Sequence, residues 1–466
     1  MDARSRRRHD GPMTRTIDAD YLVVGAGAMG MAFTDALVDH SDVRVAMVDR
    51  RHSVSGHWLE AYPFVRLHQA SAFYGVASTL LGGGQLQQRG PEKGLQERAN
   101  QAEICAYYFR VLDRMIESGK VEFFANSEYA DRTVVSRVSG ERFEVAEHCR
   151  IVDAHYLSPS IPAEKPAPFA VAADARVLPV NDLARLDDAS SQYVVVGSGK
   201  TATDACIWLL SRGVDPDAIC WVRPRDPWMI NRAVVQPDPV VFTGLAADTM
   251  EAAASSTSAE DLFLRLEDAG IMLRVDRTVM PTMAKAPTLA VWELEQLRTL
   301  ENVVRRGHIE AVDRGKLTFA NGSIAIADDA VVVHCAADGL KYPPLVPVWQ
   351  PEAITLQPMR AGFPCFAAAL LGYVEATRED DAEKNRLCPP SHYGNSMVEW
   401  ARMNVLGTRS VMAFSSEPDI KDWTNRVPLN PARVPADHPG SAALDDARER
   451  LATHMATGLA RLAELS

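Results

Sequence analysis

Length, composition and charge exclude several classes of protein. The chain has 466 residues, of which 47% are apolar and 24% charged, a mix typical of a globular protein of two or three domains. The net charge of −12 argues against a nucleic-acid partner bound through a broad basic surface. The longest apolar runs, such as 365–374, hold about ten residues, too few to span a membrane. The seven cysteines never form a C-x-x-C pair, which argues against a zinc ribbon, a thioredoxin-type pair and a disulfide-stapled secreted fold.

The N-terminus has the most unusual composition. Arg4, Arg6, Arg7 and Arg8 precede any patterned segment, and no apolar stretch follows them as a signal peptide would require. We therefore expect residues 1–15 to form a disordered tail, with Met13 as an alternative start, and the protein to be cytoplasmic.

The first patterned segment is a strand–glycine–helix–strand unit. A short buried strand over 21–24 runs into a G-x-G-x-x-G loop, a helix over 31–39 follows, and a second strand over 43–48 ends in an aspartate. The glycines permit the tight turn, the close approach of the backbone to a pyrophosphate and the packing of helix on strand, while the helix N-terminus attracts phosphate. The aspartate lies 24 residues after the first glycine, where it can accept hydrogen bonds from a ribose. The unit predicts a dinucleotide site at Gly25, Ala26, Gly27, Ala28, Met29, Gly30 and Asp49.

A second unit of the same kind begins at residue 193. A strand over 193–196 leads into Gly197-Ser198-Gly199-Lys200-Thr201-Ala202, followed by a helix to residue 212 and a strand over 218–222. The third glycine is replaced by alanine, which the fingerprint tolerates, and the second strand ends in Arg223-Pro224-Arg225 instead of an acid. Guanidinium groups bind a 2′-phosphate that a carboxylate would repel, so the unit favours NADP over NAD, with Lys200 adding positive charge. The alternative is that Arg223 and Arg225 are ordinary surface charges.

The two units together predict two nucleotides. An N-terminal FAD site with an internal NADPH site is the plan of a flavoprotein that accepts hydride from NADPH. The disulfide reductases share this plan but need a cysteine pair soon after the first acid, and residues 40–100 contain no cysteine. We therefore expect an α/β fold with two Rossmann-like dinucleotide-binding domains, the second inserted in the first, and FAD and NADP(H) as cofactors.

The remaining segments complete this domain plan. We assign 16–165 to the first part of the FAD domain, 166–305 to the NADP domain with a helical insertion over 226–300, 306–410 to the second part of the FAD domain and 411–466 to a C-terminal extension. A hairpin around Asn321-Gly322 and a strand over 329–335 indicate the return to the FAD domain. Asp338 then meets the ribityl chain or pyrophosphate of FAD, unless it is a simple turn acid.

Three helical segments have roles that the pattern leaves open. The helix over 100–119, with Asn100 and Glu103 as a capping box, is expected to pack on the FAD sheet. The Met-rich insertion suits either an apolar surface for an organic substrate or an ordinary helical core, with Asn231 and Arg232 placed to hold a nicotinamide or a polar group of the substrate. The amphipathic helix over 440–464 docks on the body or on a second subunit, so a homo-oligomer is an open expectation.

Beyond the glycine units, the chain resembles the single-component flavin-dependent monooxygenases of class B. The resemblance covers most of 18–340 and rests on Asp49-Arg50-Arg51, Ser55-Gly56-His57-Trp58 and Tyr62-Pro63-Phe64-Val65-Arg66-Leu67-His68. It implies that Arg50 and Trp58 contact FAD, that the Arg66–Gln69 segment lines the isoalloxazine, and that Arg66 and His68 are the candidate catalytic residues. The alternative is that Trp58 belongs to the core and that His68 is a satisfied loop histidine.

Two departures from the family pattern limit what the resemblance implies. The Baeyer–Villiger signature F-x-G-x-x-x-H-x-x-x-W/F is replaced by Tyr156-Leu157-Ser158-Pro159-Ser160-Ile161-Pro162, which lacks both the glycine and the histidine. The first glycine of the usual pair before Trp58 is Ser55. Baeyer–Villiger chemistry is therefore not part of the prediction.

The function that the resemblance implies is oxygen transfer. NADPH would reduce FAD, reduced FAD would form a C4a-(hydro)peroxyflavin with oxygen, and one oxygen atom would pass to a small or medium organic substrate. The alternative is an NAD(P)H-dependent flavin oxidoreductase that passes electrons to an acceptor other than oxygen, and a flavin-bound regulatory or scaffold protein is a more distant one. The histidines lack metal-ligand spacing, so no metal is expected. Neither nucleic acid nor membrane is expected as a partner.

Overall fold

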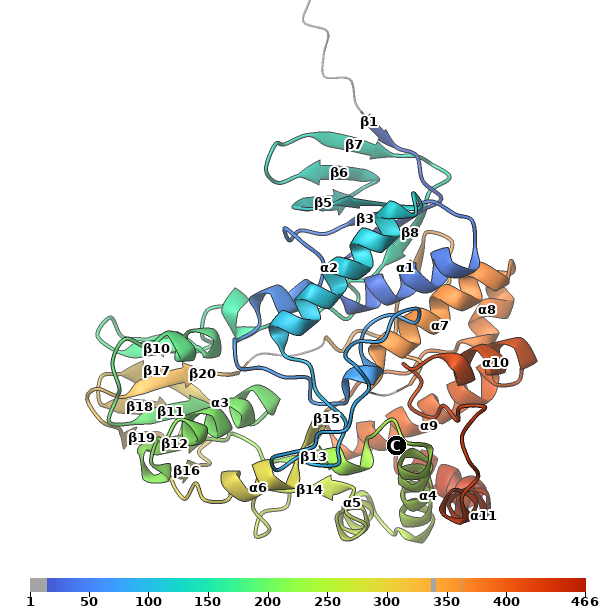
Figure 1. Cartoon of the computed structure of the whole chain (residues 1–466). Helices are drawn as coiled ribbons and strands as arrows, with labels where there is room; N and C mark the ends of the chain where they lie inside the picture. Colours follow the sequence, from blue (N-terminus) through green and yellow to red (C-terminus); the bar gives the residue numbers. More distant parts are fainter. Residues whose placement is uncertain (1–14, 337–340, 361) are drawn as a thin grey trace, which may run out of the picture.

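Two α/β units and a helical layer make up the computed structural model of the chain, which describes residues 15–336, 341–360 and 362–466 (Figure 1). Each α/β unit is built around a five-stranded sheet. The expected N-terminal tail, apart from Arg15, lies outside the described residues, as does Asp338. Within the described ranges, no helix has the length and apolar character needed to cross a bilayer.

The first sheet carries the first glycine loop. Its strands are parallel and ordered β21-β8-β2-β3-β4. Val24 is in register with Val48 and with Asp153, so three neighbouring strands end at one edge of the sheet. The strands of this sheet are β2 (Tyr21–Val24), β3 (Val45–Val48), β4 (Val121–Phe124), β8 (Arg150–Asp153) and β21 (Ala353–Thr355).

Three helices accompany this sheet (Figure 1). In α2 (Gln101–Glu117) the predicted capping box is present, because the Asn100 side chain accepts from the backbone N–H of Glu103 at 3.0 Å and Glu103 accepts in return at 2.7 Å. Helix α7 (Pro364–Thr377) packs against α1 (Ala28–His40), where a Cβ on Gly372 would overlap the carbonyl oxygen of Phe33. A small side sheet lies beyond, formed by β1 (Arg15–Ile17), β5 (Ser127–Ala130), β6 (Thr133–Ser136) and β7 (Arg142–Val145).

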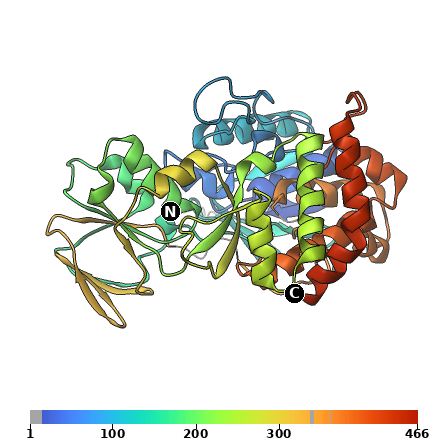
Figure 2. The same ribbon diagram turned by 90° about the horizontal axis from the view of Figure 1, so that it is seen from below.

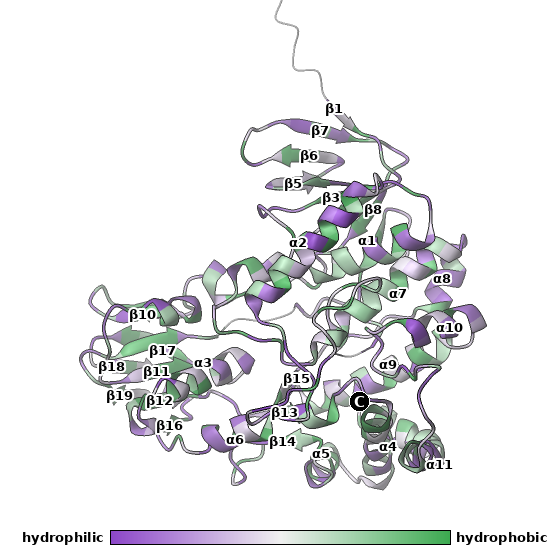
Figure 3. Ribbon diagram, viewed as in Figure 1, coloured by the Kyte–Doolittle hydropathy of each residue, from purple (hydrophilic) through white to green (hydrophobic). Residues whose placement is uncertain are grey.

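The second sheet carries the second glycine loop. It is parallel, in the order β10-β20-β11-β12-β16, and its central strands are hydrophobic and buried (Figure 3). Helix α3 (Lys200–Ser211) follows β11 directly. The strands are β10 (Arg176–Pro179), β11 (Tyr193–Val196), β12 (Ile219–Val222), β16 (Val303–Val304) and β20 (Val331–His334). A smaller sheet joins β9 (Ala170–Val171), β17 (Ile309–Asp313), β18 (Lys316–Phe319) and β19 (Gly322–Ala325).

The second unit is inserted in the first, as the sequence predicts, but the chain returns later than expected. We predicted that the strand over 329–335 belongs to the FAD domain. Instead β20 lies between β10 and β11 in the second sheet, and the chain rejoins the first sheet only at β21. A run of valines suits any strand buried on both faces, so it cannot specify which sheet the strand enters.

The helical layer combines the insertion with the C-terminal region (Figure 2). The insertion is not purely helical, because a three-stranded sheet accompanies its helices. The closing helix α11 docks on α4, where a Cβ on Gly458 would lie 2.5 Å from the carbonyl oxygen of Met250. The insertion contains β13 (Pro227–Asn231), β14 (Met272–Leu273), β15 (Met283–Leu289), α4 (Pro239–Ser255), α5 (Ala259–Asp268) and α6 (Val291–Leu297). The C-terminal helices are α8 (Asp381–Leu387), α9 (Met397–Phe414), α10 (Pro418–Arg426) and α11 (Ala442–Glu464).

Candidate cofactor and substrate site

The first glycine loop has the geometry of a phosphate cradle. Gly25 has a φ of +109°, and a Cβ on Gly30 would overlap the carbonyl oxygen of Gly25. Helix α1 begins immediately after the loop, so its N-terminus points at the edge where β2 ends. Asp49 at the end of β3 is buried and accepts the backbone N–H groups of Ala26 at 2.8 Å and Arg51 at 2.9 Å. The structure therefore brings the predicted glycines and the predicted acid together, and this cradle fits a dinucleotide.

A second backbone segment lies on this loop. A Cβ on Gly56 would lie 3.0 Å from the Cα of Gly27, so the two glycines permit a close approach of the two backbones. Ser55 has a φ of +95°, a left-handed conformation that glycine adopts at little cost. The serine that departs from the family pattern therefore keeps the backbone conformation of the glycine that it replaces.

His155 is a neighbour of the cradle that the sequence analysis did not identify. It follows β8, and its ring Cδ2 lies 2.7 Å from the position of a Cβ on Gly25. Burial lowers the pKa of the His155 imidazole below its ordinary value. The sequence signal that could have identified His155 is its place just after a buried strand that ends at the same sheet edge as β2. Arg50, for which a contact with FAD stays a prediction, pairs with Glu164 at 2.5 Å.

A cleft of about 560 Å³ separates the two glycine-loop units. It is lined by residues 197–201 of the second loop, by Trp58 from the first unit and by Lys285 from β15. Gly197 has a φ of +132°, and a Cβ on Gly199 would meet no atom within 4 Å, so the loop is open to the cleft. The Trp58 indole donates to the Tyr74 hydroxyl at 2.6 Å, which fixes its ring.

The two arginines after β12 have different surroundings. Arg225 lines the cleft. Arg223 is only 1% exposed, lies over the Trp221 ring at 4.5 Å and pairs with Asp226 at 3.1 Å. Burial, and secondarily the charge of Arg225, lower the pKa of Lys285. Positive charge in the cleft therefore comes from Arg225 and Lys285, and the second of these was missed because a lone lysine in a strand carries no signal.

Lys200 of the second loop is paired within the protein. Its ammonium contacts the carboxylate of Asp204 one turn along α3 and lies 3.6 Å from Glu293 of α6. Asp204 also accepts the Tyr62 hydroxyl at 2.8 Å, so the segment around Trp58 is joined directly to the second unit.

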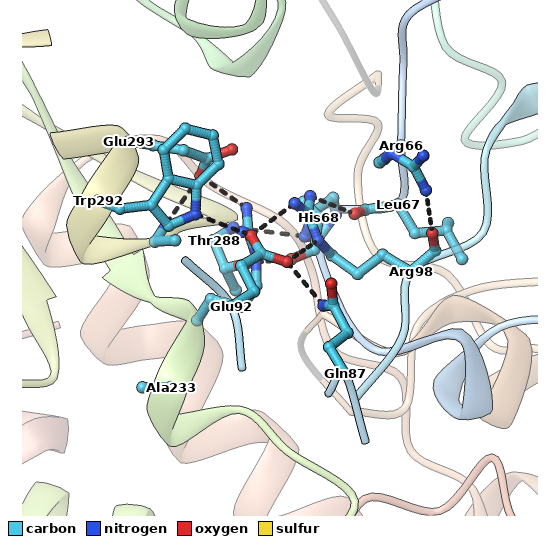
Figure 4. Close-up of polar contacts among 12 residues, drawn as sticks. Arg66, Leu67, His68, Gln87, Glu92, Arg98, Ala233, Thr288, Trp292 and Glu293 are labelled. Carbon is cyan, nitrogen blue, oxygen red and sulfur yellow. Dashed lines mark hydrogen bonds and ion pairs between the residues drawn. The ribbon is translucent and has the colours of Figure 1, made fainter. Parts of the chain in front are cut away.

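His68 lies on the loop between the units and is held by the insertion (Figure 4). Its Nδ1 accepts the backbone N–H of Thr288 at 3.3 Å, and its carbonyl accepts Nε of Arg232 at 3.0 Å and the Thr288 hydroxyl. Burial, together with the nearby cations Lys200, Arg232 and Arg98, lowers the pKa of His68 to about 3. The ring is therefore neutral near pH 7, and because Nδ1 accepts, Nε2 carries the proton.

A buried network of ion pairs surrounds His68 (Figure 4). Arg232 pairs with Glu92 and, at 2.8 Å, with Glu293, while Arg98 pairs with Glu92 at 2.6 Å. Burial alone would raise the pKa of Glu293, but Lys200, Arg232 and Arg98 lower it to about 2. Arg232, which the sequence placed near a nicotinamide or a substrate, is 1% exposed and committed to this network.

Arg66 and Gln69 flank His68 but have different surroundings. The Arg66 side chain is exposed, donates to the carbonyl of Arg98 at 3.0 Å and lines an outer groove of about 670 Å³. Figure 4 shows it directed away from His68, so the structure does not bring the two candidate catalytic side chains together. Gln69 donates to the carbonyl of Gly362 at 2.9 Å and lines a different, apolar cavity.

This apolar cavity has a volume of about 330 Å³ and lies among the insertion and the C-terminal helices. Its walls come mainly from α4, α9 and α11, and it shares Ala286 with the cleft and Thr288 with the His68 site. No group of three or more potential metal ligands occurs among the described residues.

The fold is that of a protein with two Rossmann-like dinucleotide-binding domains. The polycyclic ketone monooxygenase of the fungus Thermothelomyces thermophila shares it with a TM-score of 0.52 and 14% identity, over 97% of this chain and 90% of that one. A steroid monooxygenase solved with NADP is 13% identical over 95% of this chain and 98% of that one, with a TM-score of 0.45. No model of a protein family matches the sequence.

Closer relatives occur in mycobacteria. The uncharacterized protein Rv2000 of Mycobacterium tuberculosis is 41% identical over 428 residues, which are 91% of this chain and 79% of the relative. An uncharacterized protein of Mycobacterium bovis matches to the same extent. The chain belongs to the family of these mycobacterial proteins.

Proposed function

We propose that the protein is a FAD- and NADPH-dependent monooxygenase that transfers one oxygen atom to a small or medium organic substrate. The observation that carries the proposal is the segment 56–62, which contacts the first glycine loop and the helix that follows the second one. Gly56 lies on Gly27 of the first loop, Trp58 lines the cleft, and Tyr62 bonds to Asp204 of the second unit. Such a segment would bring the reactive ends of two bound dinucleotides to one place, as hydride transfer between them requires.

The first loop would hold FAD through its backbone and Asp49. The tight approach of Gly25, Gly30 and Gly56 leaves no room for side chains at the pyrophosphate, and the start of α1 supplies N–H groups. When bound, FAD supplies the redox chemistry, because it accepts a hydride and passes electrons to oxygen. Trp58, fixed by Tyr74, covers the place where the two units meet.

The second loop would hold NADPH, and Arg225 would select it over NADH. Residues 197–201 offer the pyrophosphate an open backbone, while Arg225 and Lys285 place positive charge in the cleft for a 2′-phosphate. A contact of Arg223 with the 2′-phosphate stays a prediction. Because Arg223 is buried and paired with Asp226, Arg225 is favoured as the main contact of the 2′-phosphate.

His68 would act as a fixed neutral donor beside the apolar cavity, because it contacts Thr288 of the cavity wall. Its Nδ1 is occupied by Thr288, and its backbone carbonyl is clamped by Arg232, so the ring has one orientation in which Nε2 carries a proton. Burial and the nearby cations lower the pKa of His68, so the imidazole stays neutral and keeps the same donor and acceptor atoms throughout the neutral range.

Two measurements test this function. Purified protein should contain FAD, and NADPH should bleach the visible flavin absorption band in the absence of oxygen. With labelled oxygen gas and a set of organic candidates, one labelled atom should appear in a product for each NADPH consumed. If NADPH is consumed by the flavin but no candidate gains label while an artificial acceptor is reduced, the alternative of a flavin oxidoreductase replaces the proposal.

A further inference from the structure

Arg360 is the one charged side chain among the described residues that line the apolar cavity. It lies in the loop between β21 and α7, close to the Gly362 carbonyl that accepts from Gln69. The cavity walls are mainly aliphatic and aromatic, with Phe242, Met250 and Trp400 among them, and the other polar residues of the lining are uncharged. A full charge in such surroundings is costly unless an opposite charge or hydrogen bonds compensate it.

No compensating group belongs to the described residues. Among the described residues, the guanidinium has no hydrogen bond or ion pair, and it lies over the face of the Phe242 ring, whose centroid is 5.0 Å away. Burial alone lowers the pKa of Arg360 to about 10, so the side chain remains a cation at neutral pH. The contrast with the two fully buried arginines is clear, because Arg223 pairs with Asp226 and Arg232 pairs with Glu92 and Glu293.

We propose that the apolar cavity binds a ligand with an apolar body and a carboxylate, and that the carboxylate pairs with Arg360. Resting on the proposed function, we infer that this carboxylic acid is the substrate, because the cavity adjoins the His68 site through Thr288. The volume of about 330 Å³ lies near the lower end of the range for small-molecule sites, about 300–1,000 Å³. A medium-chain fatty acid or an arylalkanoic acid fits that size.

The planar guanidinium suits a carboxylate in particular. It can donate two parallel hydrogen bonds to the two oxygens, and charge-assisted bonds of this kind are stronger than those between neutral groups. The apolar body would occupy the space between α4, α9 and α11, whose methionines adapt to varied shapes. A neutral amide of the same length should therefore bind much more weakly.

The test compares octanoate with octanamide by isothermal titration calorimetry on the FAD-loaded protein, with no NADPH present. We expect octanoate to bind about tenfold or more tightly, the difference that one charged hydrogen-bonded contact supplies. In R360Q this preference should disappear while the affinity for octanamide stays the same, and R360K should keep part of it. The matched control is R409Q, which removes an exposed arginine on α9 and should leave both affinities unchanged.

Three results would overturn the inference. The first is equal binding of octanoate and octanamide to the unmodified protein, which needs no variant and so does not depend on how R360Q folds. The second is a preference that survives in R360Q. The third is loss of FAD from R360Q without any carboxylate preference in the unmodified protein, which would assign Arg360 to the cofactor. Because no turnover is measured, a failure of the oxygenase proposal alone leaves the binding result intact.

Discussion

Replacing Arg232 with methionine should strongly destabilise the protein. Arg232 is 1% exposed, and its partners Glu92 and Glu293 are 6% and 4% exposed. Removing one member of a buried ion pair leaves the other charge uncompensated, at a cost of about 3–5 kcal/mol. Glu92 keeps Arg98 at 2.6 Å and Glu293 keeps Lys200 at 3.6 Å, so we expect the lower half of that range for R232M.

The measurement is urea unfolding of the FAD-loaded protein, followed by circular dichroism and by flavin fluorescence. The two probes should coincide if the network couples the units, because Arg232 and Glu293 belong to the insertion while Glu92 belongs to the first unit. In the double variant R232M/E293Q the loss should be smaller than the sum of the two single losses, by about 0.5–3 kcal/mol. The control R409M should stay within about 0.5 kcal/mol of the unmodified protein. A loss below about 1 kcal/mol in R232M would refute the reasoning, since it would mean that Arg98 and Lys200 alone compensate the two buried carboxylates fully.

Three further predictions follow from the site. G30A should lose FAD, because its Cβ would overlap the Gly25 carbonyl oxygen. The control G244A, whose Cβ meets nothing within 4 Å, should retain FAD. Equal FAD content in the two purified variants would contradict the role of the first glycine loop as a phosphate cradle. R225A should raise the KM for NADPH at least tenfold and leave that for NADH nearly unchanged, measured by initial rates, and a parallel rise for both cofactors would remove the 2′-phosphate role. The pKa of His68 is about 3 in the folded protein, below its unfolded value of about 6.5. Between these pH values the unfolded state binds more protons than the folded state, so the protein should become less stable as the pH drops from about 6.5 towards 3. H68Q should flatten the slope of the free energy of unfolding, obtained from urea curves across this pH range, by up to about 1.4 kcal/mol per pH unit. An unchanged slope would count against a neutral His68 in the folded protein.

The glycine units could be predicted from the sequence because their physics is local. A strand, a glycine turn and a helix N-terminus follow one another within a few residues, and Asp49 is placed by the strand that it ends. The α2 capping box is local in the same way, and it is confirmed. The two Rossmann-like sheets and the insertion of one unit in the other follow from these signals.

What the sequence could not supply depends on contacts between distant segments. The valines of β20 fit either parallel sheet, so the point of return to the first unit was misplaced. Arg223 and Arg225 are two residues apart, a spacing that would place both on one face of a strand. One is nevertheless buried against Asp226 and the other lines the cleft, because β12 ends at Val222 and the chain bends at residues 224 and 225. The Arg232–Glu92 pair joins residues separated by 140 positions, and no periodic pattern encodes it.

Anaerobic titration of the purified protein with NADPH tests the central claim most directly. The account predicts a yellow protein whose flavin absorption is bleached fully by one equivalent of NADPH per chain, with NADH far less effective, and whose absorption returns when oxygen is admitted. A colourless protein that binds no FAD, or a flavin that NADPH does not reduce, would contradict it.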